Sequence, residues 1–253
     1  MGWPLGSLIA AACTRIGRKG RRIAYEALID PQNRYLGDRG PIVSSPGIYY
    51  RQNPHVTDAI TAKSRTLVAA VPTSSAAESP LPDVVPEGEM VAGNFRAARL
   101  LTGSEANLSA VFAQLPKVSV FHFAGHALSG PQRSGLLLSD MLFESDSLKP
   151  RSLSSMQLAV FSACDTQDIS TEGVYNADSM VRAFLREGVP NVVASRWNVD
   201  SAATRQFMSL FYQALLNGNS VAESIHRAQI GLRSAPGMAH PYYWSAFTDF
   251  GLT

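Results

Sequence analysis

The chain has 253 residues, of which 45% are hydrophobic and 17% are charged, and its formal net charge is +2. This composition excludes a disordered chain, allows a sizeable packed core, and gives no indication of direct nucleic-acid binding. The two cysteines, Cys13 and Cys164, are too few for a disulfide scaffold and fit a reducing cytoplasm. The apolar segment 3–13 is shorter than the ~18 residues of a membrane span, so we expect a cytoplasmic protein without a membrane segment.

The first forty residues have the weakest pattern of the chain. Residues 1–23 form a poorly patterned segment, in which the spacing fits a short helix over residues 7–16. We expect one large domain over residues 24–253. Residues 22–29 predict a strand or a helical turn, and residues 30–40, which contain proline and glycine, predict a loop.

The next segments lead to the first clearly buried strand. Residues 41–50 predict a strand interrupted by a Pro-Gly turn, and the apolar spacing of residues 56–64 favours a helix. Residues 65–71 (RTLVAAV) are typical of a buried strand. Residues 72–88 are rich in proline, serine and acidic residues, so they predict a long exposed loop.

The middle of the chain alternates between helical and strand patterns. Residues 89–101 predict a helix followed by a strand, and Ser104 is a good N-cap for a helix over residues 105–115. A buried strand follows over residues 118–127. The short apolar run within residues 129–140 indicates a hairpin arm.

The same alternation continues to the C-terminus. We expect a one-turn helix at residues 152–156 and a buried strand over residues 158–166. The remaining expected elements are a helix capped by Asn176 or Asp178 and closed by Gly188, a strand over residues 190–197, a helix over residues 202–216 capped by Asp200 or Ser201, a helix over residues 220–234 capped by Ser220, and a strand over residues 245–251. This order predicts an α/β fold with a mostly parallel sheet and helices on both faces.

Two apolar runs end in residues that can do chemistry, the first in His126 and the second in Cys164. Functional groups gather beyond the carboxyl ends of parallel strands, so we expect these two side by side, as a thiol nucleophile and its general base. A lone cysteine in an apolar run is more often a buried core residue, and a histidine beside a glycine is often a turn residue. The polar Asp165 after Cys164 favours the nucleophile, which must meet solvent.

Small residues flank the candidate base. With Gly125 and Ala127 beside His126, the backbone N–H groups there are little shielded, and together with the N–H of Cys164 they are candidates for an oxyanion hole. His122 lies four residues before His126. Because side chains alternate between the two faces of a strand, this even spacing places both histidines on the same face. We interpret His122 as a supporting or structural histidine.

Five segments together resemble one known family, the CHAT domain: HFAGHA, FSACDT, AFLREGVPNVVASRWNVDS, FYQALLNGNSVAESIHRAQIGL and HPYYWSAFTDFG. The family is a caspase-like cysteine peptidase module, related to caspases and separase and often found with tetratricopeptide repeats. The resemblance covers about residues 24–252. It implies a caspase-like sheet, with His126 as catalytic base and Cys164 as nucleophile, and peptide-bond hydrolysis in a protein or peptide substrate through a thioester.

The chain departs from the family pattern in two places. Ala127 stands where the family commonly has glycine, and the N-terminal region fits only loosely, with no helical repeats before it. A tetratricopeptide-repeat sensor or activator outside this chain is therefore an expected partner, and the enzyme is latent without it. The alternatives are a catalytically silent scaffold that binds a partner through the same cleft, and a small-molecule hydrolase or acyltransferase. No nucleotide-binding motif or metal-spaced cysteine pair occurs, so we expect no cofactor and no metal.

Acidic and aromatic residues near the expected strand ends suggest a specificity. An acidic pocket of Asp165, Asp178 and Asp200 would favour Arg or Lys before the cut, by charge-assisted pairing. The alternative for Asp178 and Asp200 is that they only cap helices. Trp197 and the aromatic residues 242–244 either wall the cleft or belong to the core.

Overall fold

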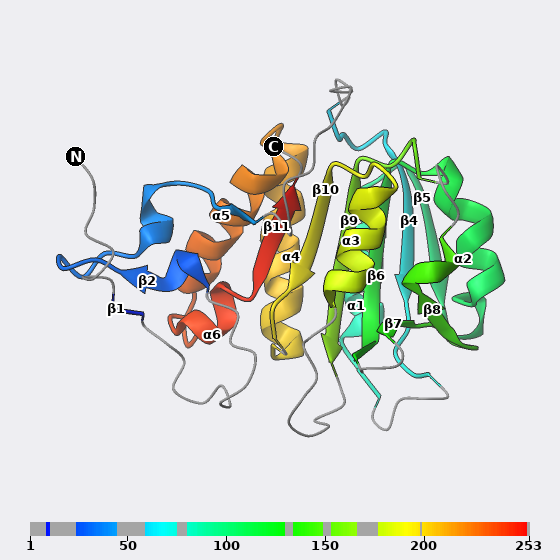
Figure 1. Ribbon diagram of the computed structural model, residues 1–253, viewed down its shortest axis with the longest axis horizontal. Helices are drawn as coiled ribbons and strands as arrows, with labels where there is room; N and C mark the ends of the chain where they lie inside the picture. The colour runs from blue at the N-terminus through cyan, green and yellow to red at the C-terminus, as the bar shows by residue number, and fades with distance from the viewer. Residues whose placement is uncertain are drawn as a thin grey trace.

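A nine-stranded sheet forms the centre of the part of the chain that the computed structural model describes, which comprises residues 9–10, 24–44, 59–74, 80–129, 134–148, 153–165, 177–197 and 199–251. Figure 1 shows the strands of this sheet side by side, from β11 on the left to β5 on the right, with α3 in front of them. The strand order is β3-β11-β10-β9-β6-β4-β5, with β7 pairing to β6 and β8 pairing to β7. The strands of this sheet are β3 (Val43–Ser44), β4 (Arg65–Ala70), β5 (Ala97–Thr102), β6 (Val120–Ser129), β7 (Ser134–Leu137), β8 (Leu142–Glu144), β9 (Leu158–Asp165), β10 (Asn191–Ser195) and β11 (Phe247–Gly251).

The middle of the sheet is parallel, as the alternation of strands and helices predicts. Strands β5, β4, β6, β9 and β10 pair in parallel, and β11 joins β10 antiparallel at one side. At the sheet's edge, β3 pairs parallel to β11, and the β7–β8 hairpin folds back antiparallel on the end of β6. The carboxyl ends of β4, β6, β9 and β10 therefore meet along one edge of the sheet.

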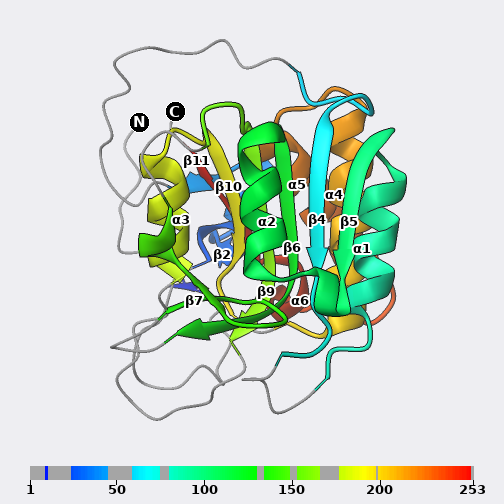
Figure 2. The same cartoon turned by 90° about the vertical axis from the view of Figure 1, so that its right-hand side faces the viewer.

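Helices cover both faces of the sheet, which confirms the predicted fold class. Figure 2 shows α2 and α3 on one face and α1, α4 and α5 on the other. The helices are α1 (Val84–Gly93), α2 (Leu108–Gln114), α3 (Ala177–Arg186), α4 (Ser201–Leu216), α5 (Val221–Arg233) and α6 (Pro241–Trp244), with single 3₁₀ turns at Tyr25–Ala27, Leu36–Arg39, Gly103–Glu105, Leu115–Lys117 and Ser145–Ser147. Of the helices in the described ranges, none has the length and apolar character needed to cross a bilayer.

Each face of the sheet has its own hydrophobic core. On the α3 side, the rings of Phe121 and Phe161 pack against Phe184, with centroid distances of 6.1 and 5.0 Å. On the α4 side, Val120 and Val160 join a second cluster that contains Phe211. Because β6 and β9 are covered on both faces, their sequences are continuous apolar runs rather than alternating ones.

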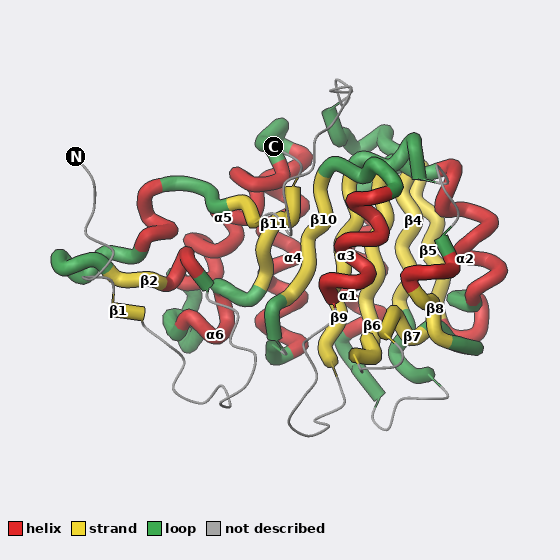
Figure 3. The backbone as a smooth tube through the Cα atoms, in the orientation of Figure 1, coloured by secondary structure: helices red, strands yellow, loops and turns green. Residues whose placement is uncertain are grey.

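The N-terminal segment 24–44 lies over α5 and α6 and is mostly loop (Figure 3). Its strand β2 (Leu28–Ile29) pairs antiparallel with β1 (Ile9–Ala10). The ring of Tyr35 meets Trp244 of α6 edge-on at 5.0 Å, and Arg233 of α5 pairs with Asp38. These contacts attach the segment to the helical face of the domain.

Several helix ends follow the sequence signals. Asp200 Oδ1 accepts hydrogen bonds from the backbone N–H groups of Ala202 and Ala203, so it is the N-cap of α4. Ser220 Oγ accepts from the N–H of Glu223 at the start of α5. Gly188, just after α3, has φ of +94°, a conformation that favours glycine at a helix end.

The largest error of the sequence prediction concerns residues 72–88, because helix α1 begins inside this range at Val84. The sequence does not predict a helix here because Pro86 and Gly88 both have low helix propensity. Tertiary packing overrides that propensity. A Cβ atom at Gly88 would lie 2.7 Å from the Cβ of Ala70, so glycine allows α1 to approach β4 closely.

Other predicted boundaries are also wrong. Ser104 does not cap a helix, because residues Gly103–Glu105 form a 3₁₀ turn and the N-cap of α2 is Asn107, whose side chain accepts from the N–H of Ala110. Residues 59–64 form a turn and no helix, and residues 153–156 form a turn closed by Met156 and Leu153. Ile9–Ala10 is a strand rather than part of a helix, and the rest of the predicted segment 7–16 lies outside the described residues.

Candidate active site

The register of β6 and β9 brings the two chemically competent residues to adjacent positions. The strands pair in parallel from Val120 opposite Leu158 through to Ala127 opposite Asp165, and His126 lies opposite Cys164. Both positions lie near the carboxyl end of this parallel ladder, one pair before its last. Parallel neighbours in register share a face of the sheet, so the backbone places positions 126 and 164 on the same face.

Two hydrogen bonds from the flanking strands hold the ends of β6 and β9. The N–H of Val71, just after β4, donates to the carbonyl of Ala124 at 2.8 Å. The hydroxyl of Ser195, the last residue of β10, donates to the carbonyl of Ala163 at 2.9 Å. The residues immediately before Gly125 and Cys164 are therefore fixed to their neighbours, and Ser195 is a residue that sequence reasoning missed.

Gly125 is required by a close approach rather than by an unusual backbone angle. A Cβ atom there would lie 2.9 Å from Cζ of Phe123 and 3.0 Å from the carbonyl oxygen of Val71. The first distance is shorter than the Cβ contacts seen in proteins, and the second is at the tight end of their range. The glycine therefore lets β6 pass the end of β4 without displacement.

The two flanking residues of His126 differ in their strand pairing. Ala127 pairs with Leu136 of β7 on one side and with Asp165 of β9 on the other. Gly125 pairs with Ala163 of β9, and in the described ladders its other side lies between the last β4 pair, at Ala124, and the first β7 pair. In the described ladders, Gly125 thus has a strand partner on one side, whereas Ala127 has one on each side.

His126 is 1% exposed, so its ring is enclosed by the protein. His122, on the same strand, is fully buried and connects three elements. Its Nε2 lies 3.1 Å from Oε1 of Glu87 on α1, and its Nδ1 lies 3.1 Å from the hydroxyl of Tyr212 on α4. Burial, and secondarily the nearby Glu87 carboxyl, raise the pKa of Tyr212 well above its usual value.

The network of Glu87, His122 and Tyr212 gives His122 the structural role that the sequence suggested, and it adds two residues that sequence reasoning missed. Glu87 fell in the predicted loop, and Tyr212 stands within an otherwise apolar helix face. A buried histidine needs hydrogen-bond partners for its ring nitrogens. A buried position for His122 therefore implies a polar partner from another element, without indicating which residue it is.

The acidic residues predicted near the site lie on different elements. Asp165 is the last residue of β9, beside Cys164, and Asp178 is the second residue of α3; their side chains lie outside the described part of the structure. Asp178 is inside the helix rather than before it, so it is not the N-cap. The carboxylate of Asp200 accepts two hydrogen bonds from backbone N–H groups at the start of α4. It therefore acts as a helix cap, which was the alternative to a role in the substrate pocket.

Trp197 follows β10 at the same edge of the sheet. Its indole Nε1 donates to the carbonyl of Tyr242 at 2.9 Å, and its ring packs against the core cluster on the α4 side together with Tyr243. The indole is therefore held by the segment before β11. Trp244 is fully buried and donates to the carbonyl of Ala239.

A buried ion pair lies next to Trp197. The guanidinium of Arg196 forms two hydrogen bonds to the carboxylate of Glu26, at 2.9 and 3.0 Å, and a third to the carbonyl of Ser245. Both side chains are almost fully buried. The bidentate geometry joins the N-terminal segment to the carboxyl end of β10. Among the described residues, no group of three or more His, Cys, Asp or Glu is arranged to hold a metal ion.

Comparison with known proteins agrees with the geometry. The family model of the CHAT domain matches residues 21–252. The chain is 34% identical over 100 residues to tetratricopeptide repeat protein 28 of Mus musculus, covering 38% of this chain and 4% of that protein. It is 24% identical over 276 residues to the Homo sapiens protein of the same name, covering 87% of this chain and 11% of that protein. The chain therefore spans a small part of the length of both relatives.

The fold is also that of a solved cysteine proteinase. The Arg-specific cysteine proteinase gingipain R matches with a TM-score of 0.54 and 13% identity, over 78% of this chain and 49% of that one. At this identity the likeness concerns the fold alone, which is caspase-like: a mostly parallel sheet with helices on both faces.

Proposed function

The chain belongs to the CHAT domain family, and on that premise we propose that it is a cysteine endopeptidase acting on a protein partner. Cys164 is the nucleophile and His126 is the general base. The observation that carries the proposal is the register of β6 and β9, in which these two residues are direct neighbours at the carboxyl edge of the sheet. A thiol works in its reduced form, so the proposed activity belongs in a reducing compartment such as the cytoplasm.

The proposed reaction has two stages. His126 removes the thiol proton, and the thiolate of Cys164 attacks the carbonyl carbon of the scissile peptide bond. The tetrahedral intermediate collapses to a thioester, and the departing amine takes the proton from His126. Water, deprotonated by His126, then hydrolyses the thioester and regenerates the thiol.

The oxyanion of the tetrahedral intermediate needs backbone donors. We place this role on the N–H of Cys164 and on the backbone at Gly125, rather than at Ala127. The reason is that Ala127 is paired by strands on both sides, whereas Gly125 is paired by β9. One such donor contributes about 3 kcal/mol of transition-state stabilisation in well-studied enzymes.

A basic residue before the cut is the proposed specificity, and it rests on Asp165. This residue directly follows the nucleophile and ends β9. Asp200 does not contribute, because its carboxylate caps α4. Gingipain R is named as Arg-specific, but at 13% identity its specificity adds no support.

The burial of His126 supports a latent form of the enzyme. With 1% of the residue exposed, a substrate reaches the ring only after the surrounding chain moves. Both curated relatives are tetratricopeptide repeat proteins. We therefore propose that a tetratricopeptide-repeat sensor or activator drives this movement.

The same burial favours one alternative, a catalytically silent scaffold that binds a partner without cleaving it. The two functions differ in a direct test: incubation of the purified protein, alone and together with its tetratricopeptide-repeat activator, with peptides that carry Arg or Lys, or alanine as the control, at one defined position. The proposal predicts cleavage after the basic residue when the activator is present, lost in Cys164→Ala and in His126→Ala. Cleavage that persists in purified Cys164→Ala contradicts the mechanism, and partner binding without cleavage in every form supports the scaffold.

A further inference from the structure

A pocket of about 490 Å³ lies at the edge of the sheet opposite to His126 and Cys164. Its walls come from the starts of β9 and β10, the end of β11, and the turn that joins α4 to α5. Ligand sites for small molecules occupy about 300–1,000 Å³, so the pocket has the size of such a site. The strands β9 and β10 begin here and end at the candidate active site, so the two sites are separate.

The pocket combines an apolar wall with two buried oxygen atoms. Ile60 and Leu215 contribute to the apolar part of the lining. Asp249 is 2% exposed, and in the described part of the chain its Oδ1 has no hydrogen-bond partner. The same holds for Oε1 of Gln157. A buried acceptor without a donor costs folding free energy, so both atoms call for a donor from outside the described residues.

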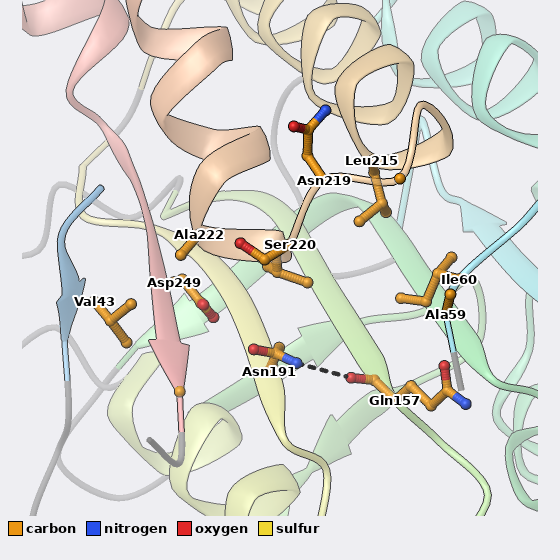
Figure 4. A pocket seen from close by; sticks show the side chains of 13 residues that line it. Val43, Ala59, Ile60, Gln157, Asn191, Leu215, Asn219, Ser220, Ala222 and Asp249 are labelled. Carbon is orange, nitrogen blue, oxygen red and sulfur yellow. Dashed lines mark hydrogen bonds between the residues drawn. The ribbon is translucent and has the colours of Figure 1, made fainter. Parts of the chain in front are cut away.

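Figure 4 shows how these groups are arranged. The carboxyl group of Asp249 points from β11 into the pocket, between Ser220 and Asn191. The side chain of Gln157 extends to the other end, beside Ile60. Between them, the Nδ2 atom of Asn191 donates to the backbone carbonyl of Gln157 at 3.4 Å. The side-chain acceptors of Asp249 and Gln157 thus lie at separate ends of one cavity.

The charge of the pocket is defined by one residue. Of the 13 lining residues, Asp249 alone is titratable, and no Lys, Arg or His is among them. Burial raises the pKa of Asp249 to about 7. Of the elements packed against β11, β3 and β10 contain no charged residue, and the charged or titratable residues of α5 do not line the pocket: Glu223, His226, Arg227 and Arg233.

We propose that this pocket binds a small aliphatic amine, whose ammonium group donates a hydrogen bond to Asp249 and whose stem lies against Leu215 and Ile60. A second donor at the far end of the ligand would meet Gln157, so a diamine fits both acceptors. The ammonium supplies the positive charge that the lining lacks. This proposal is independent of the peptidase proposal, because it uses no residue of the candidate active site.

The test is a titration of the purified protein with n-butylamine and 1,4-diaminobutane, followed by NMR at pH 8 and constant ionic strength. We expect saturable shifts at residues 215–222 and 249, tighter binding of the diamine, and no saturation by 1-butanol, which has the same stem without the charge. Asp249→Asn should weaken amine binding at least about tenfold, since it removes the charged partner. The exposed Asp146, which follows β8 and does not line the pocket, gives the matched control Asp146→Asn, which should bind as the wild type does.

Further arms of the experiment distinguish the source of the amine and protect against a folding defect. A capped lysine peptide that competes for the same shifts would show that the ammonium arrives on a side chain of another protein. Ala222→Leu fills the pocket while leaving Asp249 in place, and it should also abolish binding. Absence of saturable amine binding to the wild type, or binding as tight as that of the wild type in Asp249→Asn or in Ala222→Leu, would overturn the proposal.

Discussion

At the scale of single residues, Gly125 has little freedom to change, because it lies at a close contact beside the candidate base. A Cβ atom at this position would lie 2.9 Å from Phe123 and 3.0 Å from the carbonyl of Val71. We expect Gly125→Ala to lower the free energy of unfolding by about 1–3 kcal/mol, because the strand end must shift to relieve the overlap. Urea denaturation measures the change.

Gly93 provides the control for that substitution. It is the last residue of α1, and a Cβ atom there would meet nothing within 4 Å. Gly93→Ala should leave the stability unchanged or raise it by up to about 1 kcal/mol, as helix propensity favours alanine. Equal effects of the two substitutions would contradict the close approach at Gly125.

Asp249 links stability to pH. Burial raises its pKa from 3.8 to about 7, so the folded protein keeps a proton that the unfolded chain releases near pH 4. Since the folded state binds more protons in this interval, this group lowers the stability as pH rises from about 4 to 7, by about 4 kcal/mol in total. In Asp249→Asn this contribution disappears.

The comparison of wild type and Asp249→Asn by thermal unfolding at several pH values isolates this effect. We expect the variant to gain stability relative to the wild type between pH 5 and 8, while Asp146→Asn, at an exposed site, follows the wild type. A constant difference between Asp249→Asn and the wild type across this range would show that the carboxyl group titrates normally.

At the scale of elements, the start of α2 separates two possible caps. The sequence favours Ser104, whereas in the structure the side chain of Asn107 accepts from the N–H of Ala110 at 2.9 Å. Asn107→Ala should cost about 1 kcal/mol of stability, and Ser104→Ala should have little effect. Chemical denaturation of the two variants in parallel decides this, and a larger loss in Ser104→Ala would move the cap to the earlier residue.

Sequence patterns located most elements but not those with unusual composition. The strands β4, β6, β9 and β10 were predicted because buried parallel strands are continuous apolar runs. The start of helix α1 was predicted as loop because Pro86 and Gly88 lower helix propensity, whereas the helix packs closely against β4. Local propensity is a weak signal when a tertiary contact decides the conformation.

The adjacency of His126 and Cys164 was predicted from the sequence, and their catalytic roles stay a prediction. Parallel strands of known order place His126 beside Cys164, because the end of each strand is readable in the sequence. The partners of His122 were not predictable, since Glu87 and Tyr212 lie on two helices that are far from His122 in the sequence. The sequence contains no local pattern that links them.

At the scale of the whole molecule, the ion pair of Glu26 and Arg196 joins the N-terminal segment to the sheet. Removing one partner leaves the other charge buried, and this typically costs about 3–5 kcal/mol. We therefore expect Glu26→Ala to destabilise the protein strongly. The double variant Glu26→Gln with Arg196→Met should recover part of the loss, because it leaves no buried charge.

Thermal unfolding of the single and double variants measures this coupling. The matched control is Glu223→Ala, which breaks the exposed pair of Glu223 and Arg227 on α5 and should cost less than about 1 kcal/mol. If Glu26→Ala were as mild as Glu223→Ala, the N-terminal segment would not be attached through this ion pair.

The central claim is that His126 activates Cys164, and the most direct measurement is the rate of Cys164 alkylation as a function of pH. The protein should carry Cys13→Ser, so that a single thiol reacts. We predict rapid alkylation at pH values well below the ordinary thiol pKa of ~8.5. This rapid reaction should be lost in His126→Ala and kept in the control His226→Ala. An ordinary thiol profile that is the same with and without His126 would contradict the account.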